Sequence, residues 1–225
     1  MSNCDIDKLI EKGKEMLKSL SNNKSVDSEV FNTIIIALKQ IIAYNPELSK
    51  EVGVLIQKLI STKKLNDIKF DIVQVPVLQG RISIGHRPKL KEIPLLKREG
   101  ITHVLTLLSR KEDVKKFGES VRKFDLEWIW YPMENATPPS PDQYKGYLNL
   151  FEKLRTILDS GGFIFIHCSA GIHRTGIILF ALLLYLGFSE LEAKNVLSKL
   201  RKVTYENVGI ERLEWGKNLL KYKEN

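Results

Sequence analysis

The sequence predicts an α/β protein, with a central, mainly parallel sheet flanked by helices and an N-terminal region of three helices in front of it. Two observations support this fold class. After about Asp71, short β-branched runs alternate with longer segments of helical periodicity, which is the order of an α/β domain. One run, FIFIHC, is apolar on both faces, as is typical of a strand buried in a parallel sheet.

Three helical patterns occupy the N-terminal region. Apolar residues recur at helical spacing in each of them. The patterns cover Ile6 to Leu20, about Ser28 to Ala43, and about Pro46 to Ser61, with SNNKSVDS as the first break and Asn45-Pro46 as the second. No cluster of histidine, cysteine or carboxylate residues stands out in this region. We therefore expect residues 1–66 to form a helical region with a docking or stabilising role, and residues 67–225 to form the domain that carries the chemistry.

The strands and helices expected in the second domain can be told apart by their residue patterns. They are the β-like FDIVQVPVLQGRISIG, a helix from Leu90 to Glu99 stopped by Gly100, the strand THVLTLLS, the charged helix KEDVKKFGESVRKFD, the strand LEWIWYPM, the loop NATPPSP, a helix from Asp142 to Ser160, the strand FIFIHC and an apolar helix. The longest apolar run, Ile177 to Leu186, is about half of the roughly 20 residues that a membrane span requires. It predicts a buried helix, so no membrane partner is expected.

Charge and cysteine content indicate the class of partner and the cellular compartment. Lys and Arg outnumber Asp and Glu by 35 to 27, which gives a net charge of +8 and favours anionic partners such as phosphates, nucleic acid or acidic surfaces. The two cysteines, Cys4 and Cys168, are too few for a disulfide framework, which indicates a reducing compartment. The start of the chain, MSNCDIDKLIEKGKEM, lacks the apolar core of a signal peptide. We therefore expect a cytoplasmic protein.

The segment IHCSAGIHRTG concentrates the chemistry. A strand ends at Cys168, Gly171 permits a tight turn, and a helix is expected to begin near Arg174 or Thr175. Ligands of α/β sheets bind beyond the carboxyl ends of the strands. Successive amides at a helix N-terminus can cradle a phosphate there. The alternative, a buried cysteine in a strand-helix turn, would leave Arg174 without a purpose.

The same loop suits nucleophilic catalysis. A helix N-terminus and an arginine lower the pKa of a nearby thiol, so Cys168 is expected to react as a thiolate. Arg174 offers a planar fork for two phosphate oxygens. Thr175 can donate its hydroxyl to the sulfur, and His167 is expected to be a buried residue that orients the loop. The four histidines, His86, His103, His167 and His173, lack the spacing of a metal site.

IHCSAGIHRTG resembles the His-Cys-x5-Arg-Ser/Thr-Gly signature of the cysteine-based protein tyrosine phosphatase superfamily. The resemblance extends from about Asp71 to Leu220 and is greatest to small, atypical dual-specificity phosphatases, because GRISIGHRP, ITHVLTLLS and PMENATPPSPDQ follow in the family's order. It implies a dual-specificity phosphatase-like fold and no metal or other cofactor. It also implies phosphorylated proteins as substrates, with phosphotyrosine and also phosphoserine and phosphothreonine hydrolysed through a phosphocysteine. The implied substrate-binding residues are Ser169, Ala170, Gly171, Ile172, His173 and Arg174.

The sequence departs from the family at the general acid. Relatives carry an aspartate in a loop similar to Pro-x-Glu-Asp, whereas this chain has Pro132-Met133-Glu134-Asn135. An amide cannot donate the proton that a leaving oxygen needs, and general acid catalysis contributes about 10²- to 10⁴-fold. Three explanations stay open: Glu134, or the more distant Asp142, replaces the aspartate; the substrate has a leaving group that needs little protonation; or Asn135 is an engineered replacement.

Two alternative functions follow from this departure. An RNA 5′-triphosphatase or other phosphoanhydride phosphatase would need less acid, and the charge of +8 suits a polyanion. Ser169-Ala170 and His173, however, resemble the protein phosphatases rather than the RNA branch of the family. The second alternative is a catalytically weak domain that binds phosphoproteins, with the N-terminal helices docking a partner.

Overall fold

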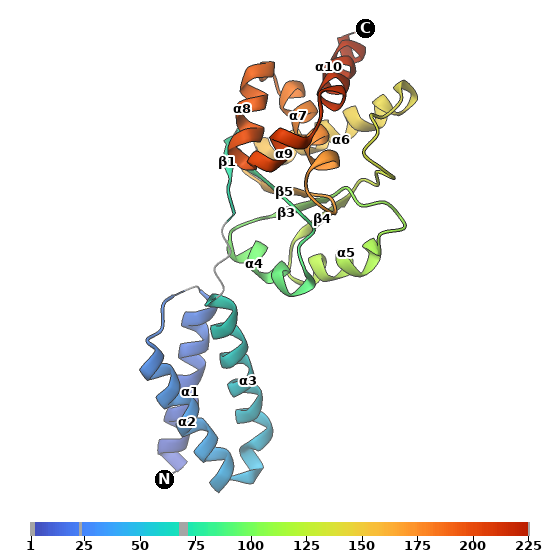
Figure 1. The fold of residues 1–225 in the computed structure, drawn as a ribbon. Helices are drawn as coiled ribbons and strands as arrows, with labels where there is room; N and C mark the ends of the chain where they lie inside the picture. The colour runs from blue at the N-terminus through green and yellow to red at the C-terminus, as the bar shows by residue number, and fades with distance from the viewer. Residues whose placement is uncertain (1–2, 23, 68–71, 225) are drawn as a thin grey trace. The chain divides into compact units, whose positions relative to one another are not determined.

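The structure is a computed structural model that describes residues 3–22, 24–67 and 72–224. The chain divides into two compact units, Met1–Phe70 and Asp71–Asn225, which are described one at a time (Figure 1). The assignment of separate roles to two domains with a boundary after residue 66 stays a prediction.

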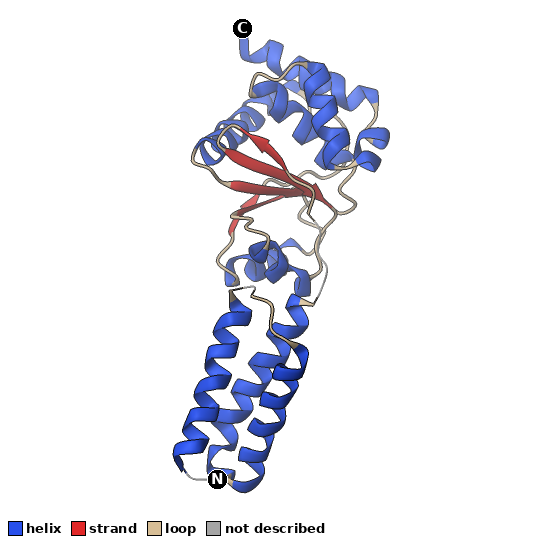
Figure 2. Ribbon diagram, turned by 90° about the vertical axis from the view of Figure 1, so that its left-hand side faces the viewer, coloured by secondary structure: helices blue, strands red, loops and turns tan. Residues whose placement is uncertain are grey.

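The first unit is a bundle of three long helices, as the sequence predicts (Figure 2). They are α1 (Asn3–Ser21), α2 (Ser28–Tyr44) and α3 (Ser49–Asn66), with a 3-10 turn at Pro46–Leu48. The Asp27 carboxylate caps α2 by accepting the amides of Glu29 and Val30. Buried aliphatic side chains from all three helices form the core, among them Leu20, Leu38, Val52 and Leu59.

The second unit contains a five-stranded sheet in the order β1-β2-β5-β3-β4. The strands are β1 (Val75–Val77), β2 (Gly80–Gly85), β3 (His103–Thr106), β4 (Glu127–Trp130) and β5 (Phe163–His167). β1 pairs antiparallel with β2, and all other pairs are parallel. β5 is fully buried between β2 and β3, which explains why its sequence is apolar on both faces. The predicted α/β class with a mainly parallel sheet is thus confirmed.

Helices cover both faces of this sheet. Figure 1 shows α4 and α5 on one side of the sheet and α6 to α10 on the other. Their bounds are α4 Ile93–Arg98, α5 Val114–Lys123, α6 Tyr144–Asp159, α7 His173–Tyr185, α8 Glu190–Leu200, α9 Lys202–Asn207 and α10 Ile210–Glu224, with 3-10 turns at Leu90–Glu92 and Pro141–Gln143. The apolar run predicted as a buried helix lies in α7 up to Tyr185, with Leu186 as the C-cap, and α7 is buried from Thr175 to Leu184. None of the helices in the described segments is long and apolar enough to cross a membrane.

Most predicted elements are shorter in the structure than in the sequence pattern. THVLTLLS pairs only over His103–Thr106, and LEWIWYPM only over Glu127–Trp130. Thr102 and Leu126 precede the strands, and the other residues of both runs continue as loops at the carboxyl ends of the strands. These loops lie next to the loop that follows β5, since the three strands are parallel neighbours.

Candidate active site

The loop after β5 joins the middle strand of the sheet to the N-terminus of α7. Its tight turn depends on Gly171, which has a φ of +70°. A Cβ atom at Gly171 would lie 2.1 Å from the carbonyl oxygen of Gly85. Only glycine combines this left-handed backbone with this close approach. The predicted strand-loop-helix arrangement is therefore present, and α7 begins at His173.

Cys168 lies at the base of this loop. Its side chain is buried, and its Sγ accepts the amide N–H of Gly171 at 3.2 Å. The thiol opens into a cavity of about 310 Å³. The cavity is lined by Ser109, Glu112, Glu134, Asn135, Ala136, Cys168, Ser169, Ala170, His173 and Arg174.

Arg174 is held in place by a residue from a different loop. Its Nη1 donates to Oε2 of Glu112 at 2.6 Å, and its Nη2 donates to Oε1 at 2.9 Å. Nη1 also donates to the carbonyl oxygens of Leu107 and Met133, each at 3.1 Å. Nη2 also donates to Oγ of Ser169 at 3.3 Å. A phosphate that binds along the Nε and Nη2 edge would therefore replace the hydroxyl of Ser169 as the second acceptor of Nη2.

The pair is strongly ionic. The hydrogen bond from Arg174 lowers the pKa of the Glu112 carboxyl to about 2, and the same bond is the main reason that the pKa of Arg174 is raised. Glu112 is therefore a carboxylate at neutral pH and cannot act as a proton donor there.

His167 is fully buried and links the loop to the sheet. Its Nδ1 lies 3.2 Å from the carbonyl oxygen of Cys168, and its Nε2 lies 2.9 Å from Oγ1 of Thr106. Because a carbonyl only accepts, Nδ1 carries the proton and Nε2 accepts from Thr106, whose oxygen in turn accepts the indole N–H of Trp128 at 2.9 Å. Burial lowers the pKa of His167 to about 3, so the imidazole is neutral.

Two side chains at the start of α9 hold the back of the loop. Nη1 of Arg201 donates to the carbonyl oxygens of Ala170 at 2.9 Å and Gly171 at 2.8 Å. The hydroxyl of Thr204 donates to the same Gly171 oxygen at 2.7 Å. With the Ala170 carbonyl directed toward Arg201, the amide of the same peptide group, that of Gly171, is directed at Cys168 Sγ.

The residues considered as the general acid differ in whether they line the cavity. Glu134 and Asn135 both line the cavity, whereas Asp142 lies in the turn Pro141–Gln143 and does not line it. Asn135 Oδ1 accepts a hydrogen bond from the amide of Thr137 at 2.8 Å, so this side chain stabilises a turn within its own loop. Of the two carboxylates that line the cavity, Glu112 is engaged by Arg174 and Glu134 is exposed.

The other predicted residues take different places. Ser169, Ala170 and His173 line the cavity, while Gly171 and Ile172 contribute backbone rather than lining. The hydroxyl of Thr175 is buried and has no hydrogen-bond partner among the described residues, so the expected bond to Cys168 Sγ is not formed in this structure. Within residues 3–22, 24–67 and 72–224, no group of three or more His, Cys, Asp or Glu could hold a metal ion.

Sequence reasoning missed the residues that hold the loop in place. Glu112, Thr106 and Arg201 are distant in sequence from the residues that they contact. The spacing of Ser109 and Glu112 matches a capping-box pattern. That pattern indicates a local turn, which the Ser109 amide confirms by donating to Glu112 Oε2 at 2.7 Å, but it does not reveal Arg174 as the partner.

Comparison with known proteins supports the family indicated by the motif. A family model described as "Swiss Army Knife protein, DSP-PTPase phosphatase domain" matches residues 75–214, which is more than half of the chain. None of the curated proteins shows significant similarity to this chain.

Similar solved structures include Tk-PTP in the active form, with a TM-score of 0.55 and 23% identity over 66% of this chain and 97% of that chain. They also include a kinase associated phosphatase whose catalytic-site cysteine is replaced by serine, with a TM-score of 0.60 and 18% identity over 71% and 99% of the two chains. At these identities the likeness establishes a shared fold.

Proposed function

Because the chain belongs to the cysteine-based protein tyrosine phosphatase superfamily, as a phosphatase of the dual-specificity type, we propose that it hydrolyses phosphomonoesters through a phosphocysteine intermediate. One observation carries this proposal. Cys168 Sγ accepts an amide of its own loop at the base of a cavity that Arg174 also lines. This is the arrangement that attack on a bound phosphate dianion requires.

In the first step, the Cys168 thiolate attacks phosphorus, forming an S–P bond as the P–O bond to the leaving group breaks. Nε and Nη2 of Arg174 and the inward amides of the loop stabilise the charge on the three equatorial oxygens. The Glu112 pair keeps the guanidinium in one orientation, so little reorganisation accompanies the reaction.

Glu134 is the residue that we propose as the general acid. It lines the cavity with Cys168, it can carry a proton, and it is not paired with Arg174. Its proton would pass to the leaving oxygen as the P–O bond breaks. Asn135, in the family position of the acid, can donate a hydrogen bond to the same oxygen without giving up a proton.

In the second step, a water molecule attacks the phosphocysteine, the S–P bond breaks, and phosphate leaves. Glu134, now a carboxylate, takes the proton from the attacking water. The free hydroxyl of Thr175 is available as a donor to the departing sulfur after a rotation of its side chain.

We propose phosphorylated proteins as the substrates. None of the residues that line the cavity is Phe, Tyr or Trp, so no large aromatic side chain in the lining selects for a flat phosphotyrosine ring alone. This supports action on phosphoserine and phosphothreonine as well as phosphotyrosine. A cytoplasmic location is the setting in which we expect these substrates.

Trapping the intermediate tests the proposal. Wild-type protein mixed with p-nitrophenyl phosphate and quenched in acid is expected to carry one phosphate on Cys168, detected by peptide mass spectrometry. Cys168→Ser should abolish turnover and labelling, while Cys4→Ser, which removes the other cysteine, should change neither. Turnover that survives Cys168→Ser would refute the mechanism.

A phosphoprotein-binding domain is the second candidate, and the observation that favours it is Asn135 in place of the acid. Such a domain would bind phosphopeptides without hydrolysing even an activated aryl phosphate. Its affinity, measured by calorimetry, would not depend on the thiolate. The absence of turnover on p-nitrophenyl phosphate, together with unchanged phosphopeptide binding by Cys168→Ser, would decide in its favour.

A further inference from the structure

A tight turn at the edge of the cavity places two cations next to the candidate active site. Residues 109–112 form this turn, in which the Glu112 amide donates to the carbonyl oxygen of Ser109 at 3.3 Å. Its outer residues, Ser109 and Glu112, both line the cavity. Its two central residues are Arg110 and Lys111, and both are exposed. Arg110 and Lys111 are not themselves lining residues, but they lie between two that are, so the turn places both cations beside the edge of the cavity.

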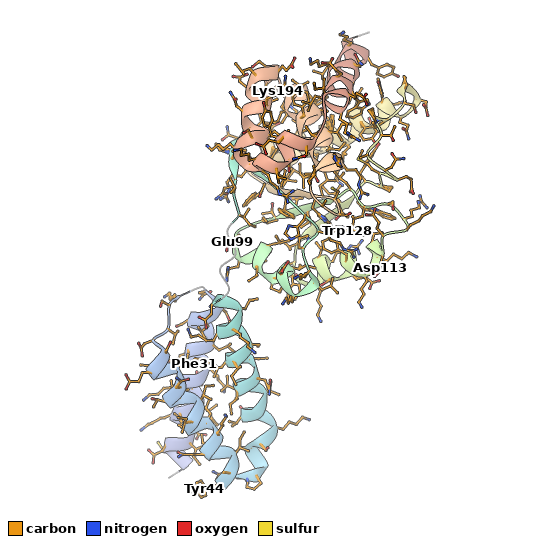
Figure 3. All side chains as sticks on the ribbon, in the orientation of Figure 1. Phe31, Tyr44, Glu99, Asp113, Trp128 and Lys194 are labelled. Atoms are coloured by element: carbon orange, nitrogen blue, oxygen red, sulfur yellow. The ribbon has the colours of Figure 1, made fainter. Side chains whose placement is uncertain are left out.

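The turn is fastened on both sides of the two cations. Before them, the indole of Trp130 donates to the Leu108 carbonyl at 2.8 Å. After them, Arg87 donates from Nη1 to the Glu112 carbonyl at 2.8 Å and from Nη2 to the Asp113 carbonyl at 3.1 Å. In Figure 3, the label Asp113 marks the start of α5, just after the turn, and the label Trp128 marks β4, the strand that also carries Trp130. The loop therefore presents Arg110 and Lys111 from a fixed base.

The charge of the turn is not neutralised. Glu112 directs its carboxylate at Arg174, away from the two cations. Neither the Arg110 side chain nor the Lys111 side chain forms a hydrogen bond or ion pair with another described residue. Glu134, in the loop that follows β4, is the carboxylate on the other part of the lining. The mouth of the cavity thus has a positive side at the turn and an acidic residue at the loop after β4.

We propose that Arg110 and Lys111 form a second anion-binding subsite, which selects phosphopeptides that carry acidic side chains or a second phosphate next to the phosphorylated residue. This inference rests on the proposed function and names the substrates that it prefers. While Arg174 binds the phosphate that is removed, the turn binds its anionic neighbour. Flexible, fully charged side chains suit an anion whose position varies from one peptide to another.

RNA is the less favoured polyanion. Proteins that bind single-stranded nucleic acid combine positive charge with aromatic side chains on which bases stack. The cavity lining contains no Phe, Tyr or Trp, and its one imidazole is that of His173. A peptide with flanking acidic groups requires only charge at the mouth, which the turn supplies.

The experiment compares two phosphotyrosine peptides of the same length, one with Asp and Glu around the phosphotyrosine and one with Asn and Gln. Wild-type protein is expected to have a lower KM for the acidic peptide. Arg110→Ala with Lys111→Ala should raise that KM about three- to tenfold, as expected for two exposed charge pairs. KM for the neutral peptide and kcat on p-nitrophenyl phosphate should not change.

A matched double variant separates the subsite from net charge. Lys115→Ala with Lys116→Ala removes the same charge from exposed positions in the next element, α5. It should affect the acidic peptide much less, and the preference of the wild type should weaken with added salt more than that of the turn variant. Equal effects of both double variants would overturn the subsite.

Two further outcomes are distinguishable. No turnover of p-nitrophenyl phosphate by the wild type would refute the proposed function itself. Normal turnover without preference for the acidic peptide would refute only the subsite. Faster phosphate release from triphosphate-ended RNA than from either peptide, reduced by the turn variant, would assign the two cations to RNA and overturn the peptide proposal.

Discussion

Arg174 and Glu112 face each other in a two-point ion pair, with Nη1 2.6 Å from Oε2 and Nη2 2.9 Å from Oε1. The pair fixes the rotation of the guanidinium about its own axis, and this rotation decides which N–H groups meet a phosphate. In the proposed mechanism, phosphate binding by Arg174 would thus depend on the Glu112 carboxylate that holds the guanidinium.

Glu112→Gln is expected to lower kcat/KM for p-nitrophenyl phosphate by about 10²-fold, because a neutral amide accepts from only one arm of the fork and the guanidinium can turn. Affinity for vanadate should fall with it. Glu119→Gln, at an exposed position of α5, is the matched control and should leave both quantities unchanged. Equal kinetics of the Glu112 variant and the wild type would show that the pair is not needed.

The general acid is tested with a pair of substitutions. Glu134→Gln should reduce kcat about 10²- to 10⁴-fold on alkyl phosphates, whose leaving groups need a proton, and far less on aryl phosphates with acidic phenols. Asn135→Asp should raise kcat on alkyl phosphates and retain the bond to the Thr137 amide, since either side chain offers Oδ1. If Glu134→Gln affects both substrate classes equally, Glu134 is not the acid.

The brace from α9 is expected to control how well the loop binds an anion. Arg201→Met removes both bonds to the Ala170 and Gly171 carbonyls, and the loop amides should lose their fixed direction. Bonds to charged groups contribute about 1.5–3 kcal/mol, so vanadate affinity should fall at least tenfold. Lys202→Met, one residue away and exposed, is the control.

Arg201→Lys, which can still reach one carbonyl, should recover part of the vanadate affinity. A thermal unfolding curve for each variant separates a loosened loop from a destabilised fold. A variant that binds vanadate normally yet melts earlier would limit Arg201 to a role in stability.

Gly171→Ala is expected to abolish activity, because its Cβ would lie 2.1 Å from the Gly85 carbonyl oxygen. Gly187→Ala is the matched control: Gly187 has a φ of +93°, similar to the +70° of Gly171, but nothing lies within 4 Å of its Cβ position. Both variants should lose about 1–2 kcal/mol to the left-handed backbone. Only Gly171→Ala should lose phosphatase activity and vanadate binding, and equal activity of the two variants would contradict this.

The buried imidazole makes stability depend on pH. In the unfolded chain His167 takes up a proton near the ordinary histidine pKa of 6.5, whereas in the folded protein its pKa is about 3. Between these values the unfolded state binds more protons, so the free energy of unfolding falls as the pH falls below 6.5. From about pH 6.5 to about pH 4.5 the loss should reach about 2 kcal/mol.

His167→Asn retains a donor for the Cys168 carbonyl and removes the titrating group, so its stability should change less over this interval. Urea unfolding followed by tryptophan fluorescence measures the difference, because all three tryptophans lie in the second unit. Parallel pH curves for the two proteins would assign the acid sensitivity to other groups.

The sequence revealed those parts of the site that are local in the chain. Strand, turn and helix around Cys168 follow from apolar β-branched residues, a glycine and a buried helical run, each of which acts on its neighbours. The residues that orient this loop could not be found in the same way. Glu112 precedes Arg174 by 62 positions, and Arg201 follows Gly171 by 30, so both contacts exist only after the sheet and its helices have packed.

The fold also has features that neighbouring residues determine and features that only long-range packing determines. The three N-terminal helices and the alternation of strands and helices were predictable from periodicity. The ends of the strands were not, because THVLTLLS and LEWIWYPM stay apolar beyond the last paired residue. Those residues are buried as loops around the cavity, where packing replaces strand pairing: Leu107 and Leu108 after β3 and Met133 after β4 are all buried.

The position of β5 at the centre of the sheet has a consequence for hydrogen exchange. Its amides are enclosed by β2 on one side and β3 on the other, so solvent deuterium reaches them only when the sheet opens as a whole. β1, a three-residue edge strand that contains Pro76, can separate without disturbing them. The strand that leads to the proposed nucleophile, Cys168, should thus be among the last segments to take up label, while the edge strand takes it up early.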